Sequence, residues 1–388
     1  MTTLSDPLGA ARALRVTIQG ARKETEEARR LAAQVVEGLR ETGLCRLAVP
    51  ASLGGHEAEP VVALKVYEEL AGAEASVAWI AWNNALLGLF SCHLSDSVRA
   101  ELFGDAGKLF ANSTRPSGKA KAVDGGFRVS GRWSLVSGCE LADWIPVMCV
   151  VTEGTEPRML ASSGAPELRM AYIPKGSYRI LDTWYVGGLR GTGSHDVVVE
   201  DVFAPAERTF SPIEPKHLDR PLYRMPLGPT MSAGCASICL GIAQTAIDAL
   251  LELGSTKVQV DLVPGLRDRP AVHAMVAASE AELDAARLLL HDSLGELWAA
   301  CSQGIPVTDR QRARTWGGAL HAAKAAKAVV TAMYEAAGAS ALYVDCPLER
   351  AHRDIYAVGQ HIILAHGWLE DAGRVRLGLK PNNPRFLL

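Results

Sequence analysis

The chain has 388 residues, 48% of them hydrophobic, which is enough to bury a sizeable core in two or three domains. Its 40 Lys and Arg against 43 Asp and Glu give a net charge of −3 without a long basic run, which argues against a nucleic-acid partner. The eight cysteines form no CxxC pair and have no histidines at zinc spacing, so neither a metal site nor a disulfide framework is expected.

Two segments bear on the cellular location. The first 17 residues, MTTLSDPLGAARALRVT, have no apolar stretch suited to a signal peptide, so a cytoplasmic protein with reduced thiols is expected. Residues 225–247 carry no charge and are long enough to span a membrane. Because they contain prolines, many small residues and a glutamine, without a flanking basic cluster, we expect a helix buried inside a bundle and no membrane.

The apolar pattern changes twice along the chain. Residues 8–103 show helical spacing, residues 109–205 show short β-branched and aromatic runs between glycine turns, and helical spacing returns after the prolines that lie between 212 and 229. We therefore expect an α+β protein. An N-terminal helical domain (1–107) precedes a central antiparallel β-sheet domain (108–210), and a C-terminal four-helix bundle (211–388) closes the chain.

Two motifs of the expected sheet identify a family when they are taken with this order of domains. They read GGFRVSGRWSLVSGCELADW (125–144) and GLRGTGSHDVVVEDVFAP (188–205). Together they resemble the acyl-CoA dehydrogenase fold. More narrowly, the chain is similar to the oxygen-using members of that fold, the two-component flavin-dependent monooxygenases and N-oxygenases.

A third segment, residues 334–361, separates two activities within this fold. It is similar to the dehydrogenase segment that contains the catalytic glutamate, yet the neighbourhood after Arg353 and Asp354 holds Gly359, Gln360 and His361. The other dehydrogenase position for a base, around 220–230, also lacks a carboxylate. Abstracting the α-proton of an acyl thioester needs such a base, so dehydrogenation is disfavoured.

The resemblance implies a reaction that uses oxygen. In such enzymes reduced flavin, FMN or FAD, reacts with O2 to a C4a-hydroperoxide, which hydroxylates or N-oxygenates a small aromatic or amine substrate. No GxGxxG motif follows a strand and opens a helix, so the reduced flavin is expected from a separate NAD(P)H:flavin reductase. Two alternatives stay open, an acyl-CoA-type dehydrogenase with an atypical base and a non-catalytic relative.

The resemblance also implies two catalytic residues. Ser137 matches a hydroxyl that lies against flavin N5 and the peroxide, although a serine at a strand end also suits a plain turn. His361, expected on a helix, would serve as a base for the substrate or as a donor to the hydroperoxide. The alternative for His361 is a structural histidine of the core.

Further residues are expected around the flavin and the substrate. Trp133 would cover the flavin while Trp144 packs in the core, and Lys257 would hold the flavin phosphate, with Arg267 and Arg269 as competitors. Backbone and hydroxyl contacts to flavin are expected from Asn112, Ser113 and Thr114 and, in a neighbouring subunit of a homotetramer, from the turn Gly338, Ala339 and Ser340. The substrate side is expected to include Trp82, Asn83, His93 and Gln360.

Overall fold

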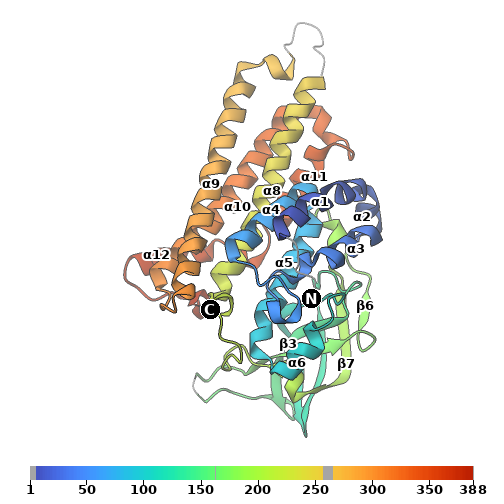
Figure 1. Cartoon of the computed structure of the whole chain (residues 1–388), viewed down its shortest axis with the longest axis vertical. Helices are drawn as coiled ribbons and strands as arrows, with labels where there is room; N and C mark the ends of the chain where they lie inside the picture. Colours follow the sequence, from blue (N-terminus) through green and yellow to red (C-terminus); the bar gives the residue numbers. More distant parts are fainter. Residues whose placement is uncertain (1–5, 162, 257–264, 388) are drawn as a thin grey trace.

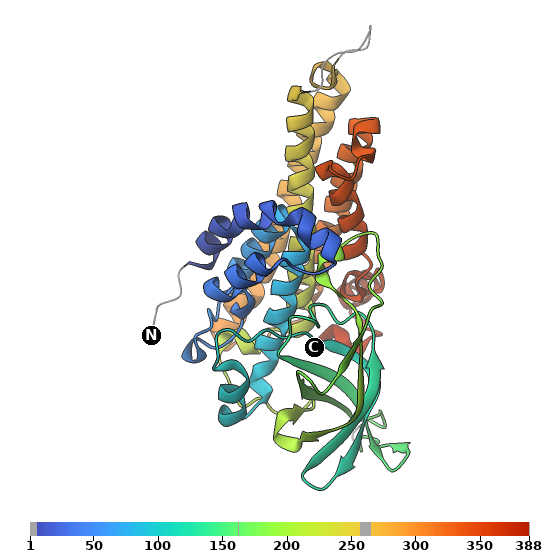
Figure 2. The ribbon, with the colours of Figure 1, turned by 90° about the vertical axis from the view of Figure 1, so that its right-hand side faces the viewer.

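The computed structural model describes residues 6–161, 163–256 and 265–387. Helices at the start of the chain pack against the side of a bundle of long helices, and the β-sheet lies below both (Figure 1). Turning the molecule shows the strands curled beneath the helices, while α8 and α9 extend away from the sheet (Figure 2). The sequence of helices, sheet and helices expected from the apolar pattern is confirmed.

Within the described residues, the N-terminal part contains six α-helices, of which α5 is buried almost all round. They are α1 (Pro7–Gly20), α2 (Arg22–Ala28), α3 (Ala33–Thr42), α4 (Pro60–Ala73), α5 (Ala75–Phe90) and α6 (Asp96–Phe103). Every residue of α5 except Asn83 and Leu89 is buried, which matches its nearly continuous apolar sequence. Because α5 contacts both α4 and α8, it brings side chains to the centre of the molecule.

The sheet contains eight strands in the order β6-β7-β2-β1-β3-β5-β8, with β4 beside β3. Their bounds are β1 (Ser113–Val123), β2 (Gly126–Trp133), β3 (Trp144–Glu153), β4 (Glu156–Pro157), β5 (Leu168–Pro174), β6 (Arg179–Leu181), β7 (Asp196–Pro205) and β8 (Thr209–Phe210). All pairs are antiparallel except β1 and β3, which are parallel. The expected antiparallel sheet is therefore mixed, because the segment after β2 returns along the other side of β1.

The C-terminal helices are α7 (Pro221–Arg224), α8 (Leu227–Thr256), α9 (Pro270–Ser302), α10 (Asp309–Ala337), α11 (Pro347–Val358) and α12 (Gly367–Arg376). Helix α10 contacts α8, α9, α11 and α12, so it forms the axis of the bundle. It begins with a capping box in which Thr308 and Gln311 satisfy each other's backbone N–H groups. Short 3₁₀ helices that matter below are η3 (Ser91–His93), η4 (Arg190–Thr192), η7 (Gly338–Leu342) and η8 (Ile362–Leu364).

Two segments, 75–93 and 227–255, are long and apolar enough to cross a membrane by composition alone. Their most apolar stretches are 89% and 78% buried inside the protein. The uncharged segment at 225–247 thus forms most of α8 and lies in the bundle, as expected. Changes in type of structure fall between Phe103 and Ser113 and between Phe210 and Pro221.

Candidate active site

Ser137 lies in a tight turn that follows β2. Leu135 and Gly138 have positive φ angles of 61° and 77°, which turn the chain sharply on both sides of the serine. The backbone N–H of Val136 donates to the His195 carbonyl at 3.0 Å, and that of Gly138 donates to the Thr192 carbonyl at 2.8 Å. The turn is therefore held against the segment that leads into β7.

The Ser137 hydroxyl is buried and has two polar neighbours. It accepts a hydrogen bond from the indole N–H of Trp79 at 3.0 Å, and its oxygen lies 2.7 Å from Ser194 Oγ. Ser194 Oγ in turn lies 2.6 Å from Thr192 Oγ1. The side chain is 7% exposed, so these bonds form largely away from water.

Trp79 also connects Ser137 to His361, which comes from the other end of the chain. The rings of Trp79 and Trp82, one helical turn apart on α5, each lie 5.4 Å from the His361 ring in an edge arrangement. His361 is placed in the turn between α11 and η8, not on the helix expected for it, because α11 ends at Val358. An imidazole, two indoles and a hydroxyl thus meet between α5, the sheet and the bundle.

His361 is neutral at ordinary pH. Burial, together with the positive charge of Arg115, lowers its pKa to about 4. The ring atom Nδ1 accepts a hydrogen bond from the Ile363 N–H at 3.3 Å, which assigns the proton to Nε2. His361 therefore offers an N–H donor, and of the two roles expected for it the donor role agrees with this geometry.

Two asparagines join α5 to the start of the sheet. Asn83 donates to the Trp79 carbonyl at 3.0 Å and accepts from the Asn112 amide at 3.3 Å. Asn84 accepts the backbone N–H of Phe110 at 2.9 Å and donates to the Ile80 carbonyl at 3.0 Å. These bonds place the segment that leads into β1 beside the two tryptophans.

Comparison with known proteins identifies the family of the chain that carries this site. Models of the acyl-CoA dehydrogenase N-terminal and C-terminal domains match residues 10–99 and 233–366. The chain is 31% identical to an indole-3-acetate monooxygenase of Pseudomonas putida, covering 92% of this chain and 90% of that protein. It is also 31% identical to the flavin-dependent monooxygenase oxygenase subunit HsaA of Rhodococcus jostii (strain RHA1), covering 90% and 92%.

A solved structure agrees with these relatives. The crystal structure of the 3-HSA hydroxylase from Rhodococcus sp. RHA1 superimposes with a TM-score of 0.88 at 29% identity, covering 98% of this chain and 99% of that one. The chain belongs to the acyl-CoA dehydrogenase family, among its flavin-dependent monooxygenases. It is an oxidoreductase of that group.

The site of this monooxygenase has groups that fit a flavin ring. The ring is flat and apolar with polar atoms at its edge, and the site offers the Ser137 oxygen, the His361 N–H and two indoles. Leu135 is 50% exposed beside Ser137 although it is apolar, and its backbone is held in the left-handed region.

The structure does not support the flavin contact expected of Trp133. Its side chain is fully buried in the core of the sheet, and its N–H donates to the Met148 carbonyl at 2.9 Å. Gly118 and Gly131, paired across β1 and β2, leave the room that its ring occupies. Trp133 is therefore a packing residue of the monooxygenase. Trp144, expected in the core, is partly buried and packs against the core, with the Arg208 guanidinium over its ring.

His93 also lies away from the site. It follows α5 in η3, eleven residues beyond Trp82, which corresponds to about 16 Å along a helix. Its ring stacks on Phe210 with the ring centres 4.9 Å apart, and burial lowers its pKa to about 4. The substrate contact expected of His93 is thus replaced by packing between α5 and the end of the sheet.

The other expected residues fall into two groups. Trp82, Asn112 and Ser113 are buried beside the site, whereas Thr114 and Gln360 are exposed at its edge. Gly338 and Ala339 are exposed and Ser340 is partly exposed in η7, on the surface of the monooxygenase at the end of α10. Lys257 lies outside the described residues.

Several residues of the site were not expected from the sequence. They are Trp79, Thr192, Ser194 and Arg115. The spacing of Trp79 and Trp82 in AWIAW was a usable signal, because residues three apart lie on one helix face. The GTGS turn lies within a motif that indicated the family, but the motif did not indicate that its hydroxyls meet Ser137, because they do so only after β2 and β7 have paired.

Proposed function

We propose that this monooxygenase is the oxygenase component of a two-component system that hydroxylates, or N-oxygenates, a small aromatic or amine substrate. It would use O2 and reduced FMN or FAD. The observation that carries the proposal is the arrangement of Ser137, Trp79 and neutral His361. Among the hydrogen-bond partners of these three side chains in the described residues there is no carboxylate, whereas acyl-CoA dehydrogenation requires one. The relatives named as indole-3-acetate monooxygenase and oxygenase subunit support the same assignment.

The residues of the chain have distinct tasks in this reaction. When bound, reduced flavin supplies the activation of O2 and the delivery of one oxygen atom to the substrate. Trp79 and Trp82 provide flat apolar surface for an aromatic ring, and Nε2–H of His361 is placed to donate to an oxygen or nitrogen atom of that ring's substituent. Trp79 and Trp82 are buried and His361 is half-buried, which limits the access of water that would compete for the oxygen atom.

The partners follow from the same proposal. A separate NAD(P)H:flavin reductase would deliver the reduced flavin, in line with the names of the relatives as oxygenase subunits. A homotetramer is proposed because Leu342, Tyr343 and Val344, next to the turn at 338–340, are apolar and 68–77% exposed. Light scattering should give four times the chain mass of 41.4 kDa. The cytoplasm is proposed because all eight cysteines are unpaired.

The proposal is tested without a reductase. Reduced FMN or FAD, prepared under argon, is mixed with the protein and with phenols, indoles or amines, and O2 is then admitted. We expect a hydroxylated or N-oxygenated product only when protein, reduced flavin and O2 are all present. Hydrogen peroxide alone, formed at the rate of free flavin, would overturn the proposal, and so would oxidation of an acyl thioester with an artificial electron acceptor.

A further inference from the structure

The hydroxyl groups of Ser137, Ser194 and Thr192 form a chain that ends at a backbone carbonyl. The Thr192 hydroxyl lies 2.9 Å from the carbonyl oxygen of Leu189. A carbonyl oxygen only accepts, so the single proton of Thr192 is donated there. The opposite arrangement would leave two oxygen lone pairs facing each other at 2.9 Å inside the protein.

This end point sets the direction of every bond in the chain. Since Thr192 has used its proton, Ser194 donates to Thr192 across 2.6 Å. Since Ser194 has then used its own proton, Ser137 donates to Ser194 across 2.7 Å. The indole N–H of Trp79 only donates, and it occupies one of the two lone pairs on Ser137 Oγ. Ser137 is left with one free lone pair and no free proton.

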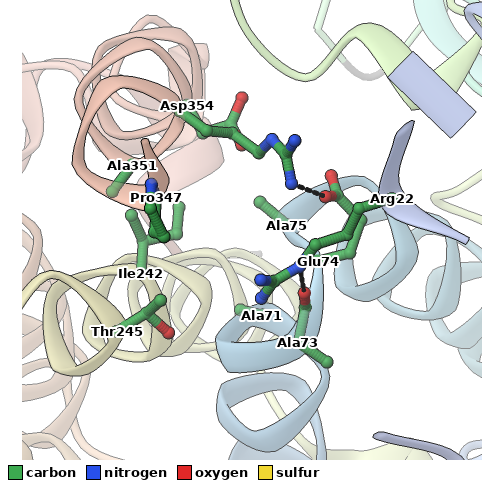
Figure 3. Close-up of a pocket in the computed structure, with 11 residues that line it drawn as sticks. Arg22, Ala71, Ala73, Glu74, Ala75, Ile242, Thr245, Pro347, Ala351 and Asp354 are labelled. Atoms are coloured by element: carbon green, nitrogen blue, oxygen red, sulfur yellow. Dashed lines mark hydrogen bonds and ion pairs between the residues drawn. The ribbon is translucent and has the colours of Figure 1, made fainter. Parts of the chain in front are cut away.

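The carbonyl at the end of the chain is held in place from the other side. Leu189 has a positive φ of 53°, which is unusual for a leucine, and its N–H donates to Asp354 Oδ1 at 2.7 Å. Asp354 belongs to α11 and is buried where α11 faces Glu74 and Arg22 across a small cavity (Figure 3). The direction of the hydroxyl chain is therefore anchored by the bundle, outside the site itself.

We infer that Thr192 and Ser194 are positioning residues that make Ser137 a hydrogen-bond acceptor, and that the site thereby selects reduced over oxidised flavin. This inference rests on the proposed function. Reduced flavin carries a hydrogen on N5 that a lone pair can accept, whereas N5 of oxidised flavin has only a lone pair. In the same position, the N5 lone pair of oxidised flavin would face the lone pair of Ser137. The hydrogen bond that reduced flavin makes would then be lost, and the two lone pairs would repel each other.

The test compares dissociation constants and needs no turnover. Oxidised FMN and FAD, and the same flavins reduced with dithionite under argon, are measured by ultrafiltration against the full-length protein. We expect tighter binding of the reduced form, with a ratio of oxidised to reduced dissociation constants that Thr192→Val lowers about tenfold, the size of one hydrogen bond. Thr192→Ser, which retains the hydroxyl, should keep the wild-type ratio within about twofold.

Ser194→Ala tests the next bond of the chain. It frees the Ser137 proton, so it should tighten the binding of oxidised flavin and lower the ratio about tenfold, equivalent to about 30 mV in the potential of bound flavin. In a Ser137→Ala background, Ser194→Ala should have no further effect on the ratio. Thr315→Val removes a buried hydroxyl of α10 that donates to the Ser293 carbonyl of α9 and takes no part in the hydroxyl chain, so it should leave the ratio unchanged.

The outcomes separate this inference from the proposed function. If Thr192→Val and Ser194→Ala keep the wild-type ratio while Ser137→Ala changes it, the hydroxyl chain does not act and the inference alone is overturned. A Thr192→Ser variant as impaired as Thr192→Val would overturn it as well. If the wild-type protein binds neither reduced FMN nor reduced FAD, the proposed function and the inference that rests on it are both overturned. Thermal unfolding identifies any variant that does not fold. If Ser194→Ala or Ser137→Ala does not fold, the comparison of Thr192→Val with Thr192→Ser still tests the inference.

Discussion

Among the side chains described at the site, His361 is the one whose free side chain takes up a proton near neutral pH. Its environment in the folded protein disfavours the protonated form. The ring lies edge-on to two indoles, which replace water around it. Resemblance to the family led to Ser137 and His361, but only the structure shows that Trp79 joins them. Helix α5 is apolar on nearly every side, so its apolar periodicity could not indicate which face points toward the site, although the spacing of Trp79 and Trp82 placed both on one face.

The depressed pKa of His361 predicts an acid-sensitive stability. Between pH 6.5 and about 4 the unfolded chain binds a proton at His361 that the folded protein refuses, so the free energy of unfolding falls as pH falls. At pH 5 this cost is about 2 kcal/mol relative to pH 7 and above. His361→Gln should lose this part of the pH dependence, measured by urea unfolding at pH 5 and 7. Equal pH dependence of the two proteins would contradict the neutral imidazole.

At the scale of elements, helix α8 depends on small residues for close packing. A Cβ at Gly241 would lie 2.2 Å from the Glu68 carbonyl of α4, and one at Gly234 would lie 2.6 Å from the Trp82 ring. The sequence indicated a buried helix with a face of small residues, and this was confirmed. The parallel pairing of β1 with β3 was not predictable, because glycine turns signal hairpins and nothing in residues 134–143 marks a return across β1.

The packing of α8 on α4 gives a second prediction. Gly241→Ala should lower the free energy of unfolding by about 1–3 kcal/mol, because backbone must move to admit the methyl group. Gly317→Ala is a matched control in the interior of α10, where a Cβ meets nothing within 4 Å. The control should be neutral or stabilising by up to about 1 kcal/mol, since alanine favours the helix. Both values come from denaturant unfolding, and similar losses in the two variants would refute the packing argument.

At the scale of the whole molecule, Arg353 joins the bundle to both other parts. Its guanidinium binds the two carboxylate oxygens of Glu26 in α2 at 3.0 Å each and also donates to the Gly187 carbonyl beside the sheet. The sequence placed Arg353 in a family motif but gave no partner for it, because Glu26 lies 327 residues away. Contacts of this range follow from the assembled fold and leave no local pattern.

A conservative substitution tests this junction. Arg353→Lys retains the charge but loses the two-pronged bond, so we expect a loss of about 1–2 kcal/mol in the free energy of unfolding. Arg132→Lys alters a pair with Asp196 in which the arginine side chain is 60% exposed, and it should cost less than about 0.5 kcal/mol. Urea unfolding of the two variants side by side provides the comparison. If the Arg353 variant is no less stable than the Arg132 variant, the junction does not hold the parts together.

The central claim is that the site inserts one atom of O2 into its substrate. The most direct measurement is a single turnover with reduced flavin, a substrate identified in the panel and ¹⁸O2, followed by mass spectrometry of the product. The account predicts one ¹⁸O atom in each product molecule, with the second oxygen atom released as labelled water. Product oxygen that comes from unlabelled solvent would contradict it.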